Sequence, residues 1–400
     1  MAAGSFERGR PTVLRFLTAG ESHGPALVAI LDGLPAGLPL DSGTIDHQLR
    51  RRMGGYGRGG RMRIEADQAR ILAGIRFGRT LGSPIALVIE NRDWPNWEAA
   101  MALERAPAPA EARRVTRPRP GHADLAGALK YGTHDARDIL ERASARETAA
   151  RVALGAICRA LLGEFDIEIA SHTTSVGSAA AATGKEAPWK RIVAAEGSPL
   201  RCADPRLEKK MIREIDAARS RGDSVGGSFE AVARGVPPGL GSHRQWDLRL
   251  SGRVARALLS IPSVKGVEVG SGFAGARARG SQVHDEIFYD SRRRAFTRGT
   301  NRAGGIEGGM TNGEEIRARA HVKPLSTLPR PLRSVDLVTK RAFLAAVERT
   351  DATAIAAAGV VGEAMLALCL AEAFLEKFGG DSLKETRRNY LGYLRQVRSF

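Results

Sequence analysis

Residues 137–165 carry the clearest helix signal in the chain and read RDILERASARETAARVALGAICRALLGEF. Ser144 followed by Glu147 matches a capping box ahead of an apolar run at helical spacing, so a helix is predicted to start there. A helix start presents unpaired N–H groups and the positive end of the helix dipole, here beside Arg142 and Arg146. Two interpretations remain open: an anion- or cofactor-binding site, or a plain surface helix with arginine on its solvent side.

A second long helix is predicted over residues 356–378, ended by Gly379 and Gly380. It contains Glu363 and Glu372, which favours a helix buried in the protein over one that spans a membrane. Between these two helices the chain alternates short apolar runs with glycine- and proline-rich turns, a pattern typical of strands. Further helices are expected at 45–52, 209–218 and 248–259, and strands at 13–17, 71–89 and 167–169.

Composition indicates a folded soluble protein. The 400 residues are 43% hydrophobic and 26% charged, within the globular range and enough for a large core. The three cysteines lie far apart without a CxxC pair, which argues against a zinc site or a disulfide framework and suits a reducing cytoplasm. The histidines lack metal-ligand spacing, and the basic N-terminus lacks the apolar core of a signal peptide.

The net charge of +17 predicts an anionic partner: nucleic acid, an acidic membrane surface or a small multiply charged substrate. Residues 50–65, RRRMGGYGRGGRMRIE, concentrate this charge. They fit a mobile basic loop, a nucleic-acid-binding segment that stacks Tyr56 on bases, or an anion clamp built from Arg52 and Arg58.

Two histidines stand in suggestive surroundings. Residues 15–24, RFLTAGESHG, predict a strand that delivers His23 to a loop between two glycines; the alternative is an ordinary turn with a solvated histidine. Residues 114–132, RVTRPRPGHADLAGALKYG, place His122 beside Arg119 on a loop stiffened by prolines. Asp351, just before the C-terminal helix, is most simply explained as its N-cap.

In chain order, GESHG, RRRMGGYGRGGRM, RPRPGHAD, ERASARETAAR, GDSVGG and NRAGGIEGGMTNG resemble the chorismate synthase family across nearly the whole chain. The resemblance implies an α+β fold, a β-α-β sandwich, as a single domain over residues 1–400 with 1–12 as a short N-terminal extension. It implies a cytoplasmic homotetramer without nucleic-acid or membrane partners.

The implied activity is that of a carbon–oxygen lyase. It converts 5-enolpyruvylshikimate 3-phosphate to chorismate and phosphate by 1,4-elimination, in the shikimate pathway to the aromatic amino acids. The family needs reduced FMN without net redox change, and NADPH is a candidate reductant. Two other functions stay open on the residues alone: a basic nucleic-acid-binding protein, and a flavin oxidoreductase that consumes NADPH.

The resemblance also implies roles for single residues. His23 is the acid that protonates the departing phosphate, His122 lies near the flavin ring, and Asp351 assists the transfer of the substrate's proton. Arg52, Arg58 and Arg119 clamp anions, and the first two are also linked to NADP. The implied flavin contacts are Arg142, Ala143, Ser144, Ser263, Gly308, Lys323, Pro324, Leu325, Ser326, Thr327 and Arg349. No metal ligands are implied.

Overall fold

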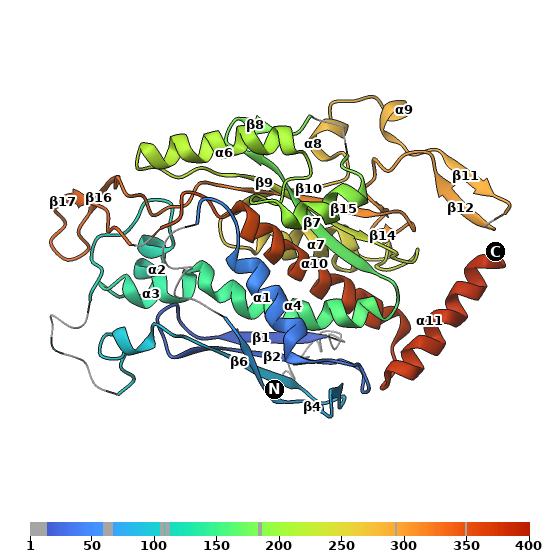
Figure 1. Cartoon of the computed structure of the whole chain (residues 1–400), viewed down its shortest axis with the longest axis horizontal. Helices are drawn as coiled ribbons and strands as arrows, with labels where there is room; N and C mark the ends of the chain where they lie inside the picture. The colour runs from blue at the N-terminus through green and yellow to red at the C-terminus, as the bar shows by residue number, and fades with distance from the viewer. Residues whose placement is uncertain are drawn as a thin grey trace, which may run out of the picture.

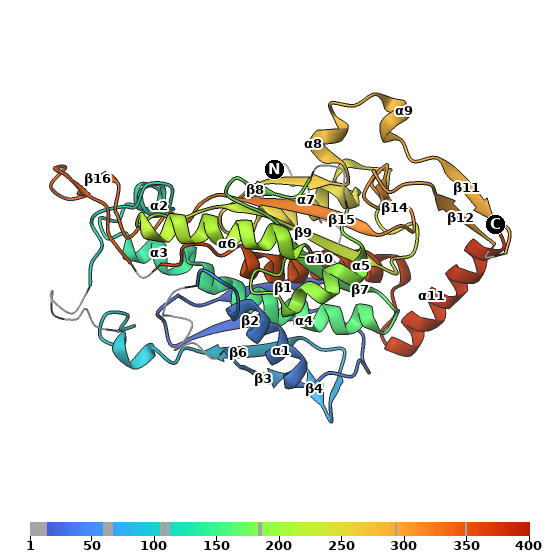
Figure 2. The same ribbon diagram turned by 45° about the horizontal axis from the view of Figure 1, so that its top comes forward.

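The computed structural model describes residues 14–58, 67–104, 108, 113–182, 186–292, 294–348 and 350–400. Its body has three layers, in which a layer of helices lies between two antiparallel sheets (Figure 1). The turned view in Figure 2 shows the same order, with α4 and α10 between the strands of the two sheets. The expected α+β sandwich is therefore confirmed.

The first sheet has the strand order β1 (Arg15–Ala19), β2 (Ala26–Asp32), β6 (Ile85–Glu90) and β3 (Ala69–Ala73). Alternation of apolar side chains fixes its register, because every second residue must face the helices. Leu27 of β2 pairs with Ile89 of β6, and Leu31 with Ile85, and all four side chains are buried.

The second sheet has the order β10 (Val264–Val269), β15 (Ile316–Val322), β9 (Gly227–Arg234), β7 (Glu168–Val176) and β8 (Ala179–Ala180). Small residues such as Ala231, Ala318 and Ala320 surround Phe229 on its inward face. Glycine allows α10 to cross here, since a Cβ added at Gly362 would lie 2.2 Å from the Phe229 ring.

The helical layer consists of α1 (Ser42–Met53), α4 (Thr148–Gly163), α7 (Leu250–Leu259) and α10 (Ile355–Phe378). Helix α10 is the one described helix long and apolar enough to span a membrane, and 89% of its apolar window is buried inside the protein. It is therefore a core helix, as its two glutamates predicted.

The other elements are shorter or peripheral. They are β4 (Ile75–Arg76), β5 (Arg79–Thr80), η2 (Trp94–Asn96), α2 (Asp124–Tyr131), α3 (Arg137–Ala143), η3 (Ala145–Glu147), α5 (Trp189–Ala194), η4 (Ala195–Gly197), α6 (Pro205–Ser220), η5 (Trp246–Leu248), α8 (Gly272–Gly275), α9 (Gly280–Val283), β11 (Ile287–Asp290), β12 (Ala295–Arg298), β13 (Ile306–Glu307), β14 (Met310–Thr311), β16 (Arg333–Val335), β17 (Ala342–Leu344) and α11 (Leu383–Arg398).

The predicted helix start at Ser144 is confirmed in a modified form. Ser144 is extended and caps the single 3-10 turn η3, and its Oγ accepts a hydrogen bond from the Arg146 N–H at 3.3 Å. The α-helix proper starts at Thr148. The reciprocal half of the capping box is absent, because the Glu147 carboxylate binds the Arg151 guanidinium instead.

Candidate active site

A cavity of about 980 Å³ opens where the loops between the three layers converge. Its lining comes from segments far apart in the chain, around residues 22–23, 52–58, 93–97, 119–123, 143–148, 261–265, 322–327 and 348–361. Such a volume is at the upper end of the range for small-molecule sites, so it has room for a substrate beside a cofactor.

Most of the residues implied by the family resemblance line this one cavity: His23, Arg52, Arg58, Arg119, His122, Ala143, Ser144, Ser263, Lys323, Leu325, Ser326, Thr327 and Asp351. Three do not line it. Arg142 donates hydrogen bonds to the carbonyls of Thr18 and Gly20, at 2.8 and 3.0 Å, and Gly308 lies in the turn between β13 and β14. Pro324 is the third residue that does not line the cavity, although its neighbours Lys323 and Leu325 do. Arg349 lies outside the described residues.

His23 is paired with a buried carboxylate. Its Nδ1 lies 2.8 Å from Glu141 Oε1, and its backbone N–H donates to Glu141 Oε2 at 2.8 Å. Arg137 binds the same carboxylate at 2.9 Å. Burial alone would raise the pKa of Glu141, but these bonds outweigh it and lower the pKa, so the group is a carboxylate. This carboxylate fixes one ring nitrogen and leaves Nε2 for the cavity.

His122 has the same arrangement. Its Nδ1 contacts Asp124 Oδ1, and Asp124 also accepts hydrogen bonds from the Arg119 Nε at 2.9 Å and backbone N–H at 3.0 Å. Burial would raise the pKa of Asp124, but the bonds from His122 and Arg119 hold it well below its usual range. Arg119 also donates to Thr327 Oγ1 at 2.9 Å, which ties this loop to the opposite wall.

Asp351 faces a cation instead of capping a helix. Arg58 Nε lies 3.2 Å from Asp351 Oδ2, and both side chains are largely buried. Helix α10 begins four residues later, with Ala354 at its N-cap and no side-chain cap. The interpretation of Asp351 as an N-cap is therefore wrong.

Arg52 and Arg146 are held at the cavity wall by hydrogen bonds and ion pairs. Arg52 donates to Thr148 Oγ1 and to the Ala145 carbonyl, each at 2.9 Å. Arg146 lies 2.5 Å from Asp67 Oδ1, and Arg52 lies 3.6 Å from the other oxygen of the same carboxylate. One buried carboxylate thus positions two guanidinium groups, an arrangement that keeps their charge at the cavity surface.

Lysines supply charge from the opposite wall. Lys323 donates to the Gly121 carbonyl and to Ser326 Oγ, the latter at 3.0 Å. Burial, and then the nearby Lys265 ammonium, lower the pKa of Lys323. Ser263 has a φ of +70°, and its carbonyl accepts from the Lys323 N–H at 2.9 Å, so the turn before β10 is held against this strand end.

The cavity is therefore cationic. Of the described residues, seven lysines and arginines line it against three carboxylates: Arg52, Arg58, Arg113, Arg119, Arg146, Lys265 and Lys323 against Asp93, Glu348 and Asp351. Among the described residues, no group of three or more His, Cys, Asp or Glu side chains is placed to hold a metal ion. The site suits a small ligand with several negative charges.

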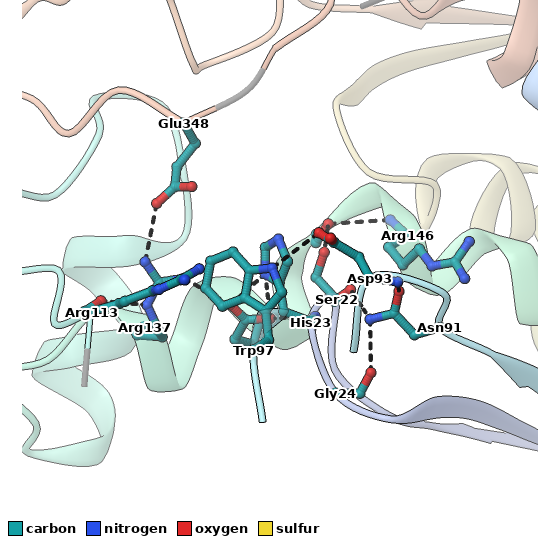
Figure 3. Close-up of polar contacts among 12 residues, drawn as sticks. Ser22, His23, Gly24, Asn91, Asp93, Trp97, Arg113, Arg137, Arg146 and Glu348 are labelled. Carbon is teal, nitrogen blue, oxygen red and sulfur yellow. Dashed lines mark hydrogen bonds and ion pairs between the residues drawn. The ribbon is translucent and has the colours of Figure 1, made fainter. Parts of the chain in front are cut away.

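Sequence reasoning missed the partners of the histidines. Neither Glu141, which stands one residue before the predicted contact Arg142, nor Asp124 was among the predicted site residues. Trp97 was not among the predicted site residues, yet it stacks on His23 (Figure 3). For His122 there was a usable signal, because Asp124 follows two residues later in the motif GHAD.

The sequence model of the chorismate synthase family matches residues 14–375. The chain belongs to the chorismate synthase family. Chorismate synthase of Solibacter usitatus (strain Ellin6076) is 57% identical over 391 residues, which cover 97% of this chain and 100% of that protein. Chorismate synthase of Aquifex aeolicus (strain VF5) is 54% identical over 395 residues, with coverage of 97% and 99%.

A solved structure described as a crystal structure of chorismate synthase superposes with a TM-score of 0.78 at 44% identity, covering 97% of this chain and 99% of that one. The family resemblance and the fold are thus confirmed. The same findings confirm the expected function, a chorismate-forming lyase of the shikimate pathway.

Proposed function

We propose that the cavity converts 5-enolpyruvylshikimate 3-phosphate to chorismate and phosphate with reduced FMN bound beside the substrate and no net redox change. The observation that supports this most directly is the pair of imidazoles, each held by a buried carboxylate, on the wall of one cationic cavity. A substrate with two carboxylates and a phosphate needs such an excess of cations, since desolvated anions are costly unless they are paired.

The residues present fit a flavin as well as the substrate. The cavity combines cations suited to a phosphate with an apolar stretch suited to a flat ring, formed by Ile261, Val264, Ala357, Ala358 and Val361. When bound, reduced FMN supplies electron density toward the breaking C–O bond and regains it afterwards.

The chain itself moves the protons. His23 donates a proton from Nε2 to an oxygen of the departing phosphate, while Glu141 stabilises the imidazolium through Nδ1. His122 also lines the cavity, oriented by Asp124, and we assign it to the flavin side. Asp351, beside Arg58, assists removal of the proton that the substrate's carbon loses.

The arginines act by preorganisation. Arg52 and Arg119 are each held by several hydrogen bonds, so their charges stay at the wall before the ligand arrives. Fixed charges of this kind stabilise a developing phosphate anion without reorganising during the reaction. Of the residues implied for flavin contacts, Ser144, Ser263, Lys323, Ser326 and Thr327 are placed to serve this role.

Phosphate release under anaerobic conditions tests the proposal. We expect release from 5-enolpyruvylshikimate 3-phosphate only when reduced FMN is present, with no NADPH consumed per product. A flavin oxidoreductase would instead consume NADPH stoichiometrically. Adding NADPH with oxidised FMN, without an outside reductase, tests whether the chain reduces its own flavin.

We further propose a single-domain, cytoplasmic homotetramer. All three cysteines are buried and free, as suits a reducing compartment. Apolar side chains lie exposed on the hairpin β11–β12, on Ile287, Phe288, Tyr289 and Phe296, and on the outer face of the first sheet. Exposed apolar patches of this kind mark subunit contacts. The excess of cations on the cavity wall suits a small anionic ligand better than a nucleic acid.

A further inference from the structure

Trp97 covers one face of the His23 ring. The two ring centroids lie 3.7 Å apart with an angle of 25° between the planes, which is close stacking (Figure 3). The indole lines the cavity and is only partly buried, and it belongs to neither of the hydrophobic clusters of the described core. Its contacts are therefore with the site and not with the core of the protein.

The indole is itself fixed on its other sides. Its Nε1–H donates to Asp93 Oδ2 at 3.0 Å, and the Arg113 guanidinium lies 4.3 Å from its ring centroid. Arg137 lies 5.1 Å from the same centroid and also binds Glu141, the partner of His23. Arg137 thus links Glu141 and Trp97, the two groups that hold the imidazole. Figure 3 shows Arg137 beside the indole.

The segment that carries Trp97 is tied to the loop that carries His23. The Asn91 side-chain amide donates to the Gly24 carbonyl at 2.8 Å, and its backbone N–H donates to the Pro25 carbonyl at 2.9 Å. Both acceptors follow His23 directly in the chain. The position of the indole relative to the imidazole is therefore set by backbone contacts as well as by stacking.

We propose that Trp97 is a positioning residue for His23. Glu141 fixes where Nδ1 lies but leaves the ring free to rock about that bond, and the indole face removes this freedom, so that Nε2 stays aimed into the cavity. The inference rests on the proposed role of His23 as the acid. Loss of such orientation costs rate more than binding, because a displacement of about 1 Å can slow a reaction on the order of 100-fold.

A double-mutant cycle tests this inference. Trp97→Leu and Trp97→Phe are each made alone and together with His23→Gln, and Trp94→Leu serves as the matched control. Trp94 lies in the same turn but does not line the cavity. We expect Trp97→Leu to lower kcat by about 10- to 100-fold with little change in KM or unfolding temperature. Trp97→Phe should restore most of the rate, and Trp94→Leu should leave it unchanged.

The combined variants decide between positioning and an independent role. If Trp97 acts through His23, Trp97→Leu adds no further loss to His23→Gln. The same fold loss in both backgrounds would overturn the inference, as would a full rate in Trp97→Leu. The proton resonances of the His23 ring give a readout without activity: the indole should shift them upfield in the parent and in Trp97→Phe, and not in Trp97→Leu.

The same data separate the inference from the proposed function. A near-normal rate in His23→Gln, with the upfield shift present in the parent, would remove His23 from the mechanism while leaving the stack in place. If His23→Gln is slow and Trp97→Leu lowers the rate by the same factor in both backgrounds, the mechanism stands and only the positioning role of Trp97 is excluded.

Discussion

At the scale of single residues, the two cavity histidines are built alike although they come from different loops. In each, Nδ1 contacts a buried carboxylate that an arginine also binds: Glu141 with Arg137, and Asp124 with Arg119. The partner of His23 is 118 residues away and that of His122 only two. This shared chemistry is the reason for testing both rings in the same way.

His23→Ala and His122→Ala should each lower turnover by about 10²- to 10⁴-fold, the usual range for groups that transfer or stabilise protons. Steady-state phosphate release at saturating substrate and reduced FMN measures this. Circular dichroism and thermal unfolding serve as controls for the fold. A variant that keeps the parent rate would show that its histidine takes no part in the reaction.

Asp351→Asn should keep the fold and flavin binding and lose rate by at least about 100-fold. The amide keeps the size of the side chain that lies beside Arg58. Helix α10 does not depend on Asp351 for its cap. Flavin titration measures the retained flavin binding, and single-turnover kinetics measure the lost rate. Unfolding of the variant under assay conditions, with lost flavin binding, would point to a structural role instead.

At the scale of elements, Glu363 is the polar exception in the buried helix α10. Its carboxylate is 1% exposed and binds Arg51 at 2.7 Å, Arg159 at 2.5 Å and Arg201 at 2.9 Å. Burial would raise its pKa, but the three arginines lower it to about 2. The group therefore stays charged and joins α10 to α1 and α4.

Glu363→Gln should destabilise the protein by about 3–5 kcal/mol, because it removes the buried counter-charge that three arginines share. Of the described carboxylates, Arg51 and Arg201 then keep only the half-exposed Glu196 as a partner. The parent gains stability from this carboxylate above pH 4.5, the ordinary value, and loses it as the pH falls toward 2. The variant should show a shallower fall of unfolding free energy across this window. Chemical denaturation at stepped pH measures both effects.

The matched control is Glu90→Gln, which breaks an exposed ion pair with Arg70 at 3.2 Å. Such surface pairs contribute little, so its unfolding curve should stay close to that of the parent at every pH. Equal losses in the two variants would show that the buried cluster has no special role.

Elements differ in how far the sequence could predict them. The cap at Asp41 and the helix α1 follow from local chemistry, and so does the alternation that defines β2 and β6. The pairing of β9 with both β7 and β15 does not, because it depends on contacts between distant segments. Trp97 was missed for the same reason, because no residue near it in the chain indicates that it contacts His23.

At the scale of the whole molecule, the hairpin β11–β12 and the C-terminal helix α11 extend from the layered body at the same end (Figure 1). Phe296 of the hairpin approaches Phe400, with ring centroids 6.3 Å apart, and both remain exposed. Isolated two-stranded hairpins are marginally stable in water, and exposed apolar patches mark contact surfaces. We therefore expect this hairpin to lie in a subunit contact of the proposed tetramer.

Phe288→Glu should shift the assembly toward smaller species, because a charge then has to be buried in the subunit contact. Sedimentation velocity measures the shift. Arg292→Glu, in the turn of the same hairpin, is a control that changes charge without touching an apolar side chain. An unchanged sedimentation coefficient in Phe288→Glu would exclude the hairpin from the interface.

The crossing of α4 and α10 has a consequence for the ligand. A Cβ at Gly155 would lie 2.4 Å from that of Ala364, so one missing methyl group sets how near the two helices come. Thr148 at the start of α4 and Val361 in α10 both line the cavity. The spacing of this helix pair therefore sets the width of the cavity wall that α4 and α10 present to substrate and flavin.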